Sequence, residues 1–147
     1  MAAFNETDLH CAYLNGLCRM ASACSEWIGR SEISVDCYTP AAFSADFAKD
    51  HGFRPEEIRL SPVGGTLRQT LVQWLGGKQP KLTDSLCWLI TSRLGEPEQI
   101  YRLENEEGLL SRFGWGEGGN TPYYFIDDVF FAAFKEVTVC FFLGNNE

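Results

Sequence analysis

The sequence predicts a single α+β domain over residues 1–147, in which N-terminal helices pack on a mostly antiparallel sheet formed largely by the C-terminal half. The length of 147 residues suits one domain. Apolar residues recur at helical spacing in the first half, whereas aromatic and β-branched residues crowd the last third. Hydrophobic residues make up 45% and aromatic residues 14%, which indicates a packed globule and excludes a disordered chain.

The first fifty residues predict a helix, a strand and a second helix. Residues 8–28 carry apolar side chains at three- and four-residue steps, with Asp8 as the N-cap. Residues 32–38 alternate between apolar and polar side chains, which predicts a half-buried strand. Thr39 and Pro40 then stand as N-cap and first residue of a helix over "AAFSADFAKDHG".

The middle of the chain predicts short helical segments separated by breakers. "RPEEIRL" predicts a helical turn, "SPVGG" a break, and Thr66 caps a third helix that ends at Gly76 and Gly77. Residues 84–94 fit two structures. Thr83 as a cap and a stripe of leucines favour a helix, whereas the run "LCWLIT" equally suits a buried strand.

The last third predicts strands at "QIYRLE", "LLSRF", "YYFIDDVFF" and "EVTVCFFLG". For residues 123–131 a helix is the alternative, with Thr121 as N-cap and Pro122 at its first position. We expect residues 136–144 to form an edge strand. Because an uncovered aromatic edge invites pairing with other chains, a helix, the chain end or another subunit is expected to cover it.

Cysteine usage and hydropathy predict the compartment. No two of the six cysteines form a C-x-x-C pair, and along a helix Cys11 and Cys18 are separated by ~10 Å, beyond the roughly 7 Å limit for a disulfide. The first ten residues lack the features of a secretory signal, and no apolar run reaches the ~18 residues of a membrane helix. We expect a cytoplasmic protein with buried reduced thiols, no membrane association, no metal and no cofactor.

The negative charge is concentrated in the last third of the chain. The net charge is −8, and residues 96–147 hold three basic and ten acidic side chains, a net charge of −7. Such a field repels nucleic acid and attracts cationic partners. The alternative is an acidic face that serves only solubility.

Asp127 and Asp128 interrupt the most aromatic run of the chain. In a strand, consecutive side chains point to opposite faces, so the two carboxylates cannot share a proton or hold one metal ion. A β-bulge would place both on the solvent side. We expect surface or bulge residues at the rim of a partner-binding site.

A glycine-rich loop and an acidic turn precede this strand. The loop lacks the lysine and the following helix that a phosphate-binding loop needs, and its Trp115 beside Glu117 suits protein recognition better. The segment "LENEEG" adds three glutamates. The predicted partner-binding residues are Glu104, Glu106, Glu107, Trp115, Glu117, Asp127 and Asp128.

These features favour a small acidic binding protein that neutralises a basic protein partner. The composition is typical of bacterial immunity and inhibitor proteins, which is an analogy of class and not of descent. No catalytic residues are predicted, because adjacent helical residues such as His10 and Cys11 do not face each other. The alternatives are an enzyme whose site combines residues distant in sequence, and a structural or adaptor subunit, such as a homodimer, that associates through its aromatic strands.

Overall fold

A five-stranded antiparallel sheet with strand order β1-β5-β4-β3-β2 forms the centre of the molecule, which confirms the predicted α+β fold class. The computed structural model describes residues 6–23, 32–75, 80–105, 108–110 and 125–145. The strands are β1 (Glu32–Tyr38), β2 (Leu60–Val63), β3 (Gln99–Leu103), β4 (Phe125–Ala133) and β5 (Thr138–Asn145). The helices are α1 (Glu6–Ala23), α2 (Phe43–Asp50), α3 (Leu67–Leu75) and α4 (Pro80–Leu94), with the short 3-10 helices η1 (Pro40–Ala42) and η2 (Pro55–Glu57).

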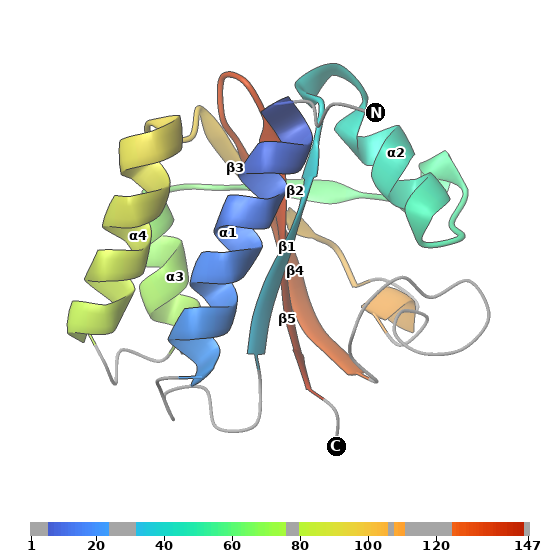
Figure 1. Cartoon of the computed structure of the whole chain (residues 1–147). Helices are drawn as coiled ribbons and strands as arrows, with labels where there is room; N and C mark the ends of the chain where they lie inside the picture. Colours follow the sequence, from blue (N-terminus) through green and yellow to red (C-terminus); the bar gives the residue numbers. More distant parts are fainter. Residues whose placement is uncertain (1–5, 24–31, 76–79, 106–107, 111–124, 146–147) are drawn as a thin grey trace.

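Helices cover both faces of the sheet. Figure 1 shows the sheet nearly edge-on, with α1, α3 and α4 on one side and α2 on the other. The strands therefore bury both of their faces, which explains why neither face of "YYFIDDVFF" is cleanly polar. None of the described helices is both long and apolar enough to cross a membrane.

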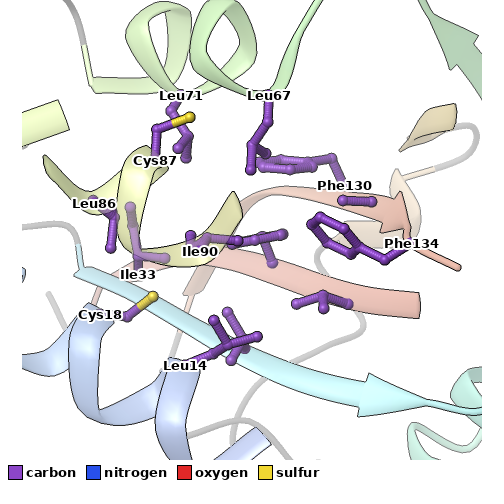
Figure 2. Close-up of a cluster of buried hydrophobic side chains, with 14 of the residues drawn as sticks. Leu14, Cys18, Ile33, Leu67, Leu71, Leu86, Cys87, Ile90, Phe130 and Phe134 are labelled. Atoms are coloured by element: carbon purple, nitrogen blue, oxygen red, sulfur yellow. The ribbon is translucent and has the colours of Figure 1, made fainter. Parts of the chain in front are cut away.

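The first core cluster fills the space between the sheet and the three helices α1, α3 and α4. On the sheet side, Phe130 of β4 stacks on Phe141 of β5, with ring centroids 4.5 Å apart and ring planes inclined by 15°. Figure 2 shows this cluster, with the labelled side chains Leu14, Cys18, Ile33, Leu67, Leu71, Leu86, Cys87, Ile90, Phe130 and Phe134.

The second core cluster is aromatic and lies between the sheet and α2. Phe131 of β4 is fully buried, and its ring centroid lies 4.9 Å from that of Phe47 and 5.4 Å from that of Phe43. Phe47 also stacks on Phe142 at 6.1 Å and lies 4.7 Å from the ring of His51. Such ring pairs contribute about 0.5–1.5 kcal/mol each beyond the burial of their area, so α2 is held mainly by these rings.

The order of the strands corrects two predictions. β5 pairs with β1 on one side and with β4 on the other, so the prediction of an edge strand at residues 136–144 is wrong. β2 forms where a break was predicted, and it lies at one edge of the sheet. Pro62 has no N–H to donate, and a strand at the edge tolerates this because one of its sides has no neighbouring strand.

β1 forms the other edge, and a side chain of α1 forms hydrogen bonds with the backbone of its central residue, Val35. Asn15 Nδ2 donates to the Val35 carbonyl oxygen at 2.7 Å, and the Val35 N–H donates to Asn15 Oδ1 at 2.9 Å. The carboxamide thus takes the place of a neighbouring strand. Because an unpaired backbone group is costly when it is withdrawn from water, these two bonds hold α1 against β1.

The capping signals predict the start of α3 but not the starts of α1 and α4, because the predicted caps Asp8 and Thr83 lie inside helices that begin at Glu6 and Pro80. α1 begins at Glu6, two residues before the predicted cap Asp8, and residues 24–28 at its predicted end lie outside the described residues. Thr66 caps α3 as predicted. The Gln69 N–H donates to Thr66 Oγ1 at 3.2 Å, and the Thr66 N–H donates to Gln69 Oε1 at 2.9 Å, which completes a capping box.

Residues 84–94, for which the sequence allows either a helix or a buried strand, are helical and belong to α4. Leu86 and Ile90 are buried in the first core cluster. Trp88 on the same helix is 68% exposed. Only a helix can bury one part of this apolar run and leave Trp88 in solvent, and Gly95 with a φ of 79° follows its last turn.

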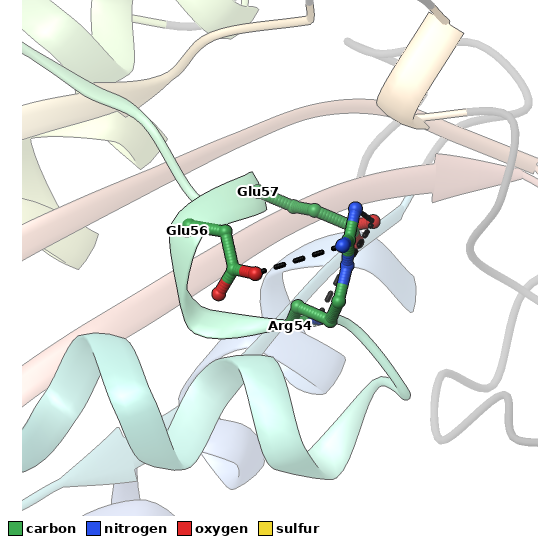
Figure 3. Close-up of polar contacts among 3 residues, drawn as sticks. All are labelled: Arg54, Glu56 and Glu57. Atoms are coloured by element: carbon green, nitrogen blue, oxygen red, sulfur yellow. Dashed lines mark hydrogen bonds and ion pairs between the residues drawn. The ribbon is translucent and has the colours of Figure 1, made fainter.

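A short polar turn precedes β2, as predicted for "RPEEIRL". η2 begins at Pro55, and the Arg54 guanidinium lies between two glutamates (Figure 3). Arg54 Nη2 is 3.3 Å from Glu57 Oε1, and Arg54 Nη1 is 3.7 Å from Glu56 Oε1. Because the Arg54 side chain is 74% exposed, the ion pairs contribute little to stability, and their main effect is to shape the turn that leads into β2.

Candidate partner-binding site

A pocket of about 430 Å³ opens at the end of β3 and contains two predicted partner-binding residues, Glu104 and Asp128. The strand register sets Ser61 of β2 opposite Arg102 of β3, and Arg102 opposite Phe130 of β4. Directly opposed residues project to the same face of a sheet, so polar side chains from three adjacent strands converge here. The described lining residues are Ser61, Arg102, Leu103, Glu104, Asn105, Leu110 and Asp128.

Asp128 is a buried member of this pocket, with 7% of its surface exposed. Its Oδ2 lies 2.7 Å from Arg102 Nη2, and its Oδ1 accepts hydrogen bonds from Arg102 Nε at 3.2 Å and from the Val129 N–H at 2.9 Å. This is a bidentate, charge-assisted pair. Of the two positions predicted for Asp128, surface or bulge, the structure shows a buried residue at the bulge, and Arg102 supplies the counter-charge that a buried carboxylate requires. Its place at the rim of a partner-binding site stays a prediction.

The predicted β-bulge is present at the aspartate pair. The register shifts between Ile126, which is opposite Gly144, and Asp128, which is opposite Leu143. Asp127 is the extra residue of the bulge, and its side chain lies outside the described part of the chain. The alternative of a helix over this run is wrong, and the bulge does not move Asp128 to the solvent side.

Glu104 lies beside the Arg102–Asp128 pair and is held at two points. The Ser61 hydroxyl donates to Glu104 Oε1 at 2.5 Å, and the Glu104 N–H donates to the Arg59 carbonyl oxygen at 2.9 Å. No cation among the described residues forms an ion pair with Glu104. Since Arg102 already pairs with Asp128, Glu104 carries the remaining negative charge of the pocket and can accept an external cation.

The segment after β3 forms the apolar wall of the pocket. Asn105 Oδ1 accepts a hydrogen bond from the Leu110 N–H at 2.7 Å, and Leu109 and Leu110 are buried in the second core cluster. Residues 108–110 form a 3-10 turn, so the predicted strand at "LLSRF" is wrong where the structure describes it. The Asn105 side chain fixes this turn against the core.

Two of the pocket residues, Glu104 and Asp128, were predicted from the sequence as partner-binding residues, but the basic residue of the pocket, Arg102, was not. Glu106, Glu107, Trp115 and Glu117 lie outside the described residues, so the structure does not place them. Arg102 and Ser61 were not predicted. The signal for Arg102 is its position two residues after buried Ile100 in β3, on the same face of the strand, where a cation needs an acidic partner.

We expect Arg102→Met to lower the free energy of unfolding by about 1–3 kcal/mol, because it leaves the Asp128 carboxylate buried without its counter-charge. Denaturant unfolding measures this change. Arg68→Met is the matched control, since Arg68 and Asp84 form an ion pair in which both side chains are about half exposed, and its loss is expected to cost at most about 1 kcal/mol. Equal costs for the two variants would contradict the structural role of Asp128.

A second hollow, of about 610 Å³, lies along α3 and α4 beside the exposed Trp88. The Arg68–Asp84 ion pair and Glu96 border it. This surface was not predicted from the sequence, because Trp88 is buried if residues 84–94 form a buried strand and is exposed only if they form a helix. Its charged border is neutralised in part by the ion pair, whereas the first pocket keeps the Glu104 charge.

The described residues also include one group with the composition of a metal site. Glu6, His10 and Glu136 offer ligand atoms within 4.8 Å of one another, and His10 Nε2 is buried without a hydrogen-bond partner. However, Arg93 Nε donates to His10 Nδ1 at 3.1 Å. A neutral imidazole that accepts at Nδ1 carries its proton on Nε2, so Nε2 has no lone pair for a metal in this arrangement.

Comparisons with protein families, with curated proteins and with solved structures gave no match to this chain. The function must therefore be inferred from the residues, and the pocket at the end of β3 brings together more of the predicted site residues than any other described part of the molecule.

Proposed function

We propose that this chain is a cytoplasmic binding protein that recognises a basic protein partner, in the neutralising manner of an immunity or inhibitor protein. The observation that carries the proposal is the Glu104 carboxylate, which lies in an open pocket without a cationic partner among the described residues. A lysine or arginine of the partner would enter this pocket and bind Glu104.

The charge distribution supports the same proposal. The pocket belongs to the segment 96–147, which holds three basic and ten acidic side chains. An excess of one sign on one part of a surface steers an oppositely charged partner and speeds its association. The described cysteines are free thiols, as expected in a reducing compartment.

The other function classes have less support in the described residues. Neither a histidine nor a cysteine is among the described residues that line the pocket, so the expected acid–base partners of an enzyme are not gathered around Asp128. β5 pairs with β1 on one side and with β4 on the other, and β4 pairs with β3 over residues 130–133. Association of an adaptor through these paired segments would require a strand of the sheet to be displaced.

The test is a titration with defined basic peptides, oligo-arginine and oligo-lysine, followed by calorimetry and by amide chemical shifts over a salt series. We expect shifts at Ser61, Arg102 and Glu104, and an affinity that falls as salt rises. Glu104→Gln is expected to weaken binding roughly 3- to 10-fold. Glu98→Gln is the control, because it makes the same change of charge at an exposed position outside the pocket.

The triple variant Glu104, Glu106 and Glu107→Gln extends the test to the two glutamates that follow Glu104 closely in the sequence. A loss larger than that of Glu104→Gln alone would assign these glutamates to the contact surface. The electrostatic mechanism would be refuted if the affinity for the basic peptides did not change with salt concentration and was the same for Glu104→Gln and Glu98→Gln.

A further inference from the structure

The two carboxylates of the pocket at the end of β3 differ in the oxygen atoms that they leave for a ligand. Both oxygens of Asp128 are paired with Arg102, Oδ1 with Nε at 3.2 Å and Oδ2 with Nη2 at 2.7 Å. Glu104 Oε1 accepts a hydrogen bond from the Ser61 hydroxyl at 2.5 Å. Among the residues that the structure describes, no side chain donates to Glu104 Oε2. This oxygen is therefore the carboxylate acceptor that the pocket offers to a ligand.

We propose that the pocket selects a lysine of the partner over an arginine, and that Ser61 determines this selectivity. The selectivity rests on the proposed function, in which a basic side chain enters the pocket. A guanidinium binds a carboxylate best through two parallel N–H groups that meet both oxygens, whereas an ammonium is a compact charge that one oxygen satisfies. An arginine would have to share Oε1 with the Ser61 hydroxyl or displace it. A lysine needs only Oε2.

The Glu104 carboxylate is held in this orientation before a ligand arrives. The Glu104 N–H donates to the Arg59 carbonyl oxygen at 2.9 Å, which continues the pairing of β3 with β2 by one residue and fixes the backbone. The Ser61 hydroxyl fixes the side chain from the same segment. Because both attachments exist in the free protein, binding does not have to order the carboxylate, which lowers the entropic cost of association.

The remaining residues of the pocket also suit a lysine. The charges of Arg102 and Asp128 cancel within their ion pair, so Glu104 leaves one negative charge for one monovalent cation. Leu110 lines the same pocket. The methylene groups of a lysine pack on such an apolar wall while the ammonium group reaches a polar one.

The test compares oligo-lysine and oligo-arginine of equal length and charge, titrated into the full chain at one fixed salt concentration. Calorimetry measures the affinity, and the amide chemical shifts of Ser61 and Glu104 report binding at this pocket. We expect oligo-lysine to bind roughly 3- to 10-fold more tightly than oligo-arginine, because the guanidinium loses one of its two hydrogen bonds to the carboxylate.

Variants of Ser61 test its part in the selectivity. Ser61→Ala releases Oε1, so the affinity for oligo-arginine is expected to rise until the ratio of the two affinities is about one or favours arginine. Ser61→Thr keeps a hydroxyl and is expected to keep the preference for lysine. Ser92→Ala is the matched control, because its hydroxyl donates to the Leu89 carbonyl oxygen of α4, outside the pocket.

The outcomes separate this selectivity from the function on which it rests. Equal affinities in the parent protein, tighter binding of oligo-arginine, or a preference for lysine that persists in Ser61→Ala would overturn the selectivity and leave the proposed function standing. If neither peptide bound in a salt-dependent manner, the proposed function would fall, and the selectivity with it.

Discussion

Phe131→Ala is expected to lower the free energy of unfolding by about 3–5 kcal/mol, the largest effect of any single change considered for this fold. Phe131 is fully buried, and its ring lies against those of Phe47 and Phe43 on the α2 side of the sheet. Removing the ring leaves a cavity at the point where β4 holds α2. Denaturant unfolding followed by far-UV circular dichroism measures the change.

Phe43→Ala is the control for this experiment. The Phe43 ring also belongs to the aromatic group, stacked 6.2 Å from Tyr101, but the residue is only half-buried. Its loss is expected to cost about half as much, because solvent already reaches part of the space that it occupies. A cost for Phe131→Ala no greater than that for Phe43→Ala would show that α2 is not anchored through β4.

The stability of the parent protein is expected to change little between about pH 4 and pH 6, because half-buried Asp36 and buried His51 have opposite effects. Burial, together with Asp50, raises the pKa of Asp36 to about 6. Burial lowers the pKa of His51 to about 4, although Asp50 acts in the opposite direction. Each shift corresponds to about 3 kcal/mol at the full difference, since one pKa unit is ~1.4 kcal/mol.

The signs follow from which state binds more protons. Between the unfolded pKa of 3.8 and about 6, the folded state holds a proton on Asp36 more readily, so stability falls as pH rises. Between about 4 and the unfolded pKa of 6.5, the unfolded state protonates His51 more readily, so stability falls as pH falls. Over their shared range the two slopes cancel.

Single variants separate the two slopes. Asp36→Asn is expected to stabilise the protein by about 1–3 kcal/mol at pH 7.5 and to expose the His51 slope, with stability falling from pH 6.5 to pH 4. His51→Phe exposes the Asp36 slope of opposite sign. Urea unfolding at several pH values measures both, and an unchanged pH profile in Asp36→Asn would refute the assignment to Asp36.

Local signals in the sequence predicted most of the secondary structure. The capping box at Thr66, the alternation over residues 32–38 and the aromatic density over residues 125–131 each depend on neighbouring residues alone. The strand order depends on pairings between distant segments, which no local pattern reports. This is why β5 was expected at an edge and why β2 was missed at "SPVGG".

In the candidate site, too, some features follow from the local sequence and others depend on contacts between distant segments. The acidic excess of the last third indicated Glu104 and Asp128 as site residues. Charge alone could not predict that Asp128 is buried in an ion pair with Arg102 while Glu104 lies in an open pocket. Arg102 of the neighbouring strand is opposite Phe130, and Phe130 is two residues from Asp128. The Arg102 guanidinium can therefore pair with the buried Asp128 carboxylate.

The pairing of Asn15 with Val35 has a consequence for how copies of this chain meet. A sheet grows when a strand of another molecule adds to an edge whose N–H and C=O groups face outward. At β1 the carboxamide of Asn15 already occupies the N–H and C=O of Val35, in the middle of the strand, and at β2 Pro62 offers no N–H. Both borders of the sheet thus resist extension, which limits aggregation in a chain whose central strands are among its most aromatic segments.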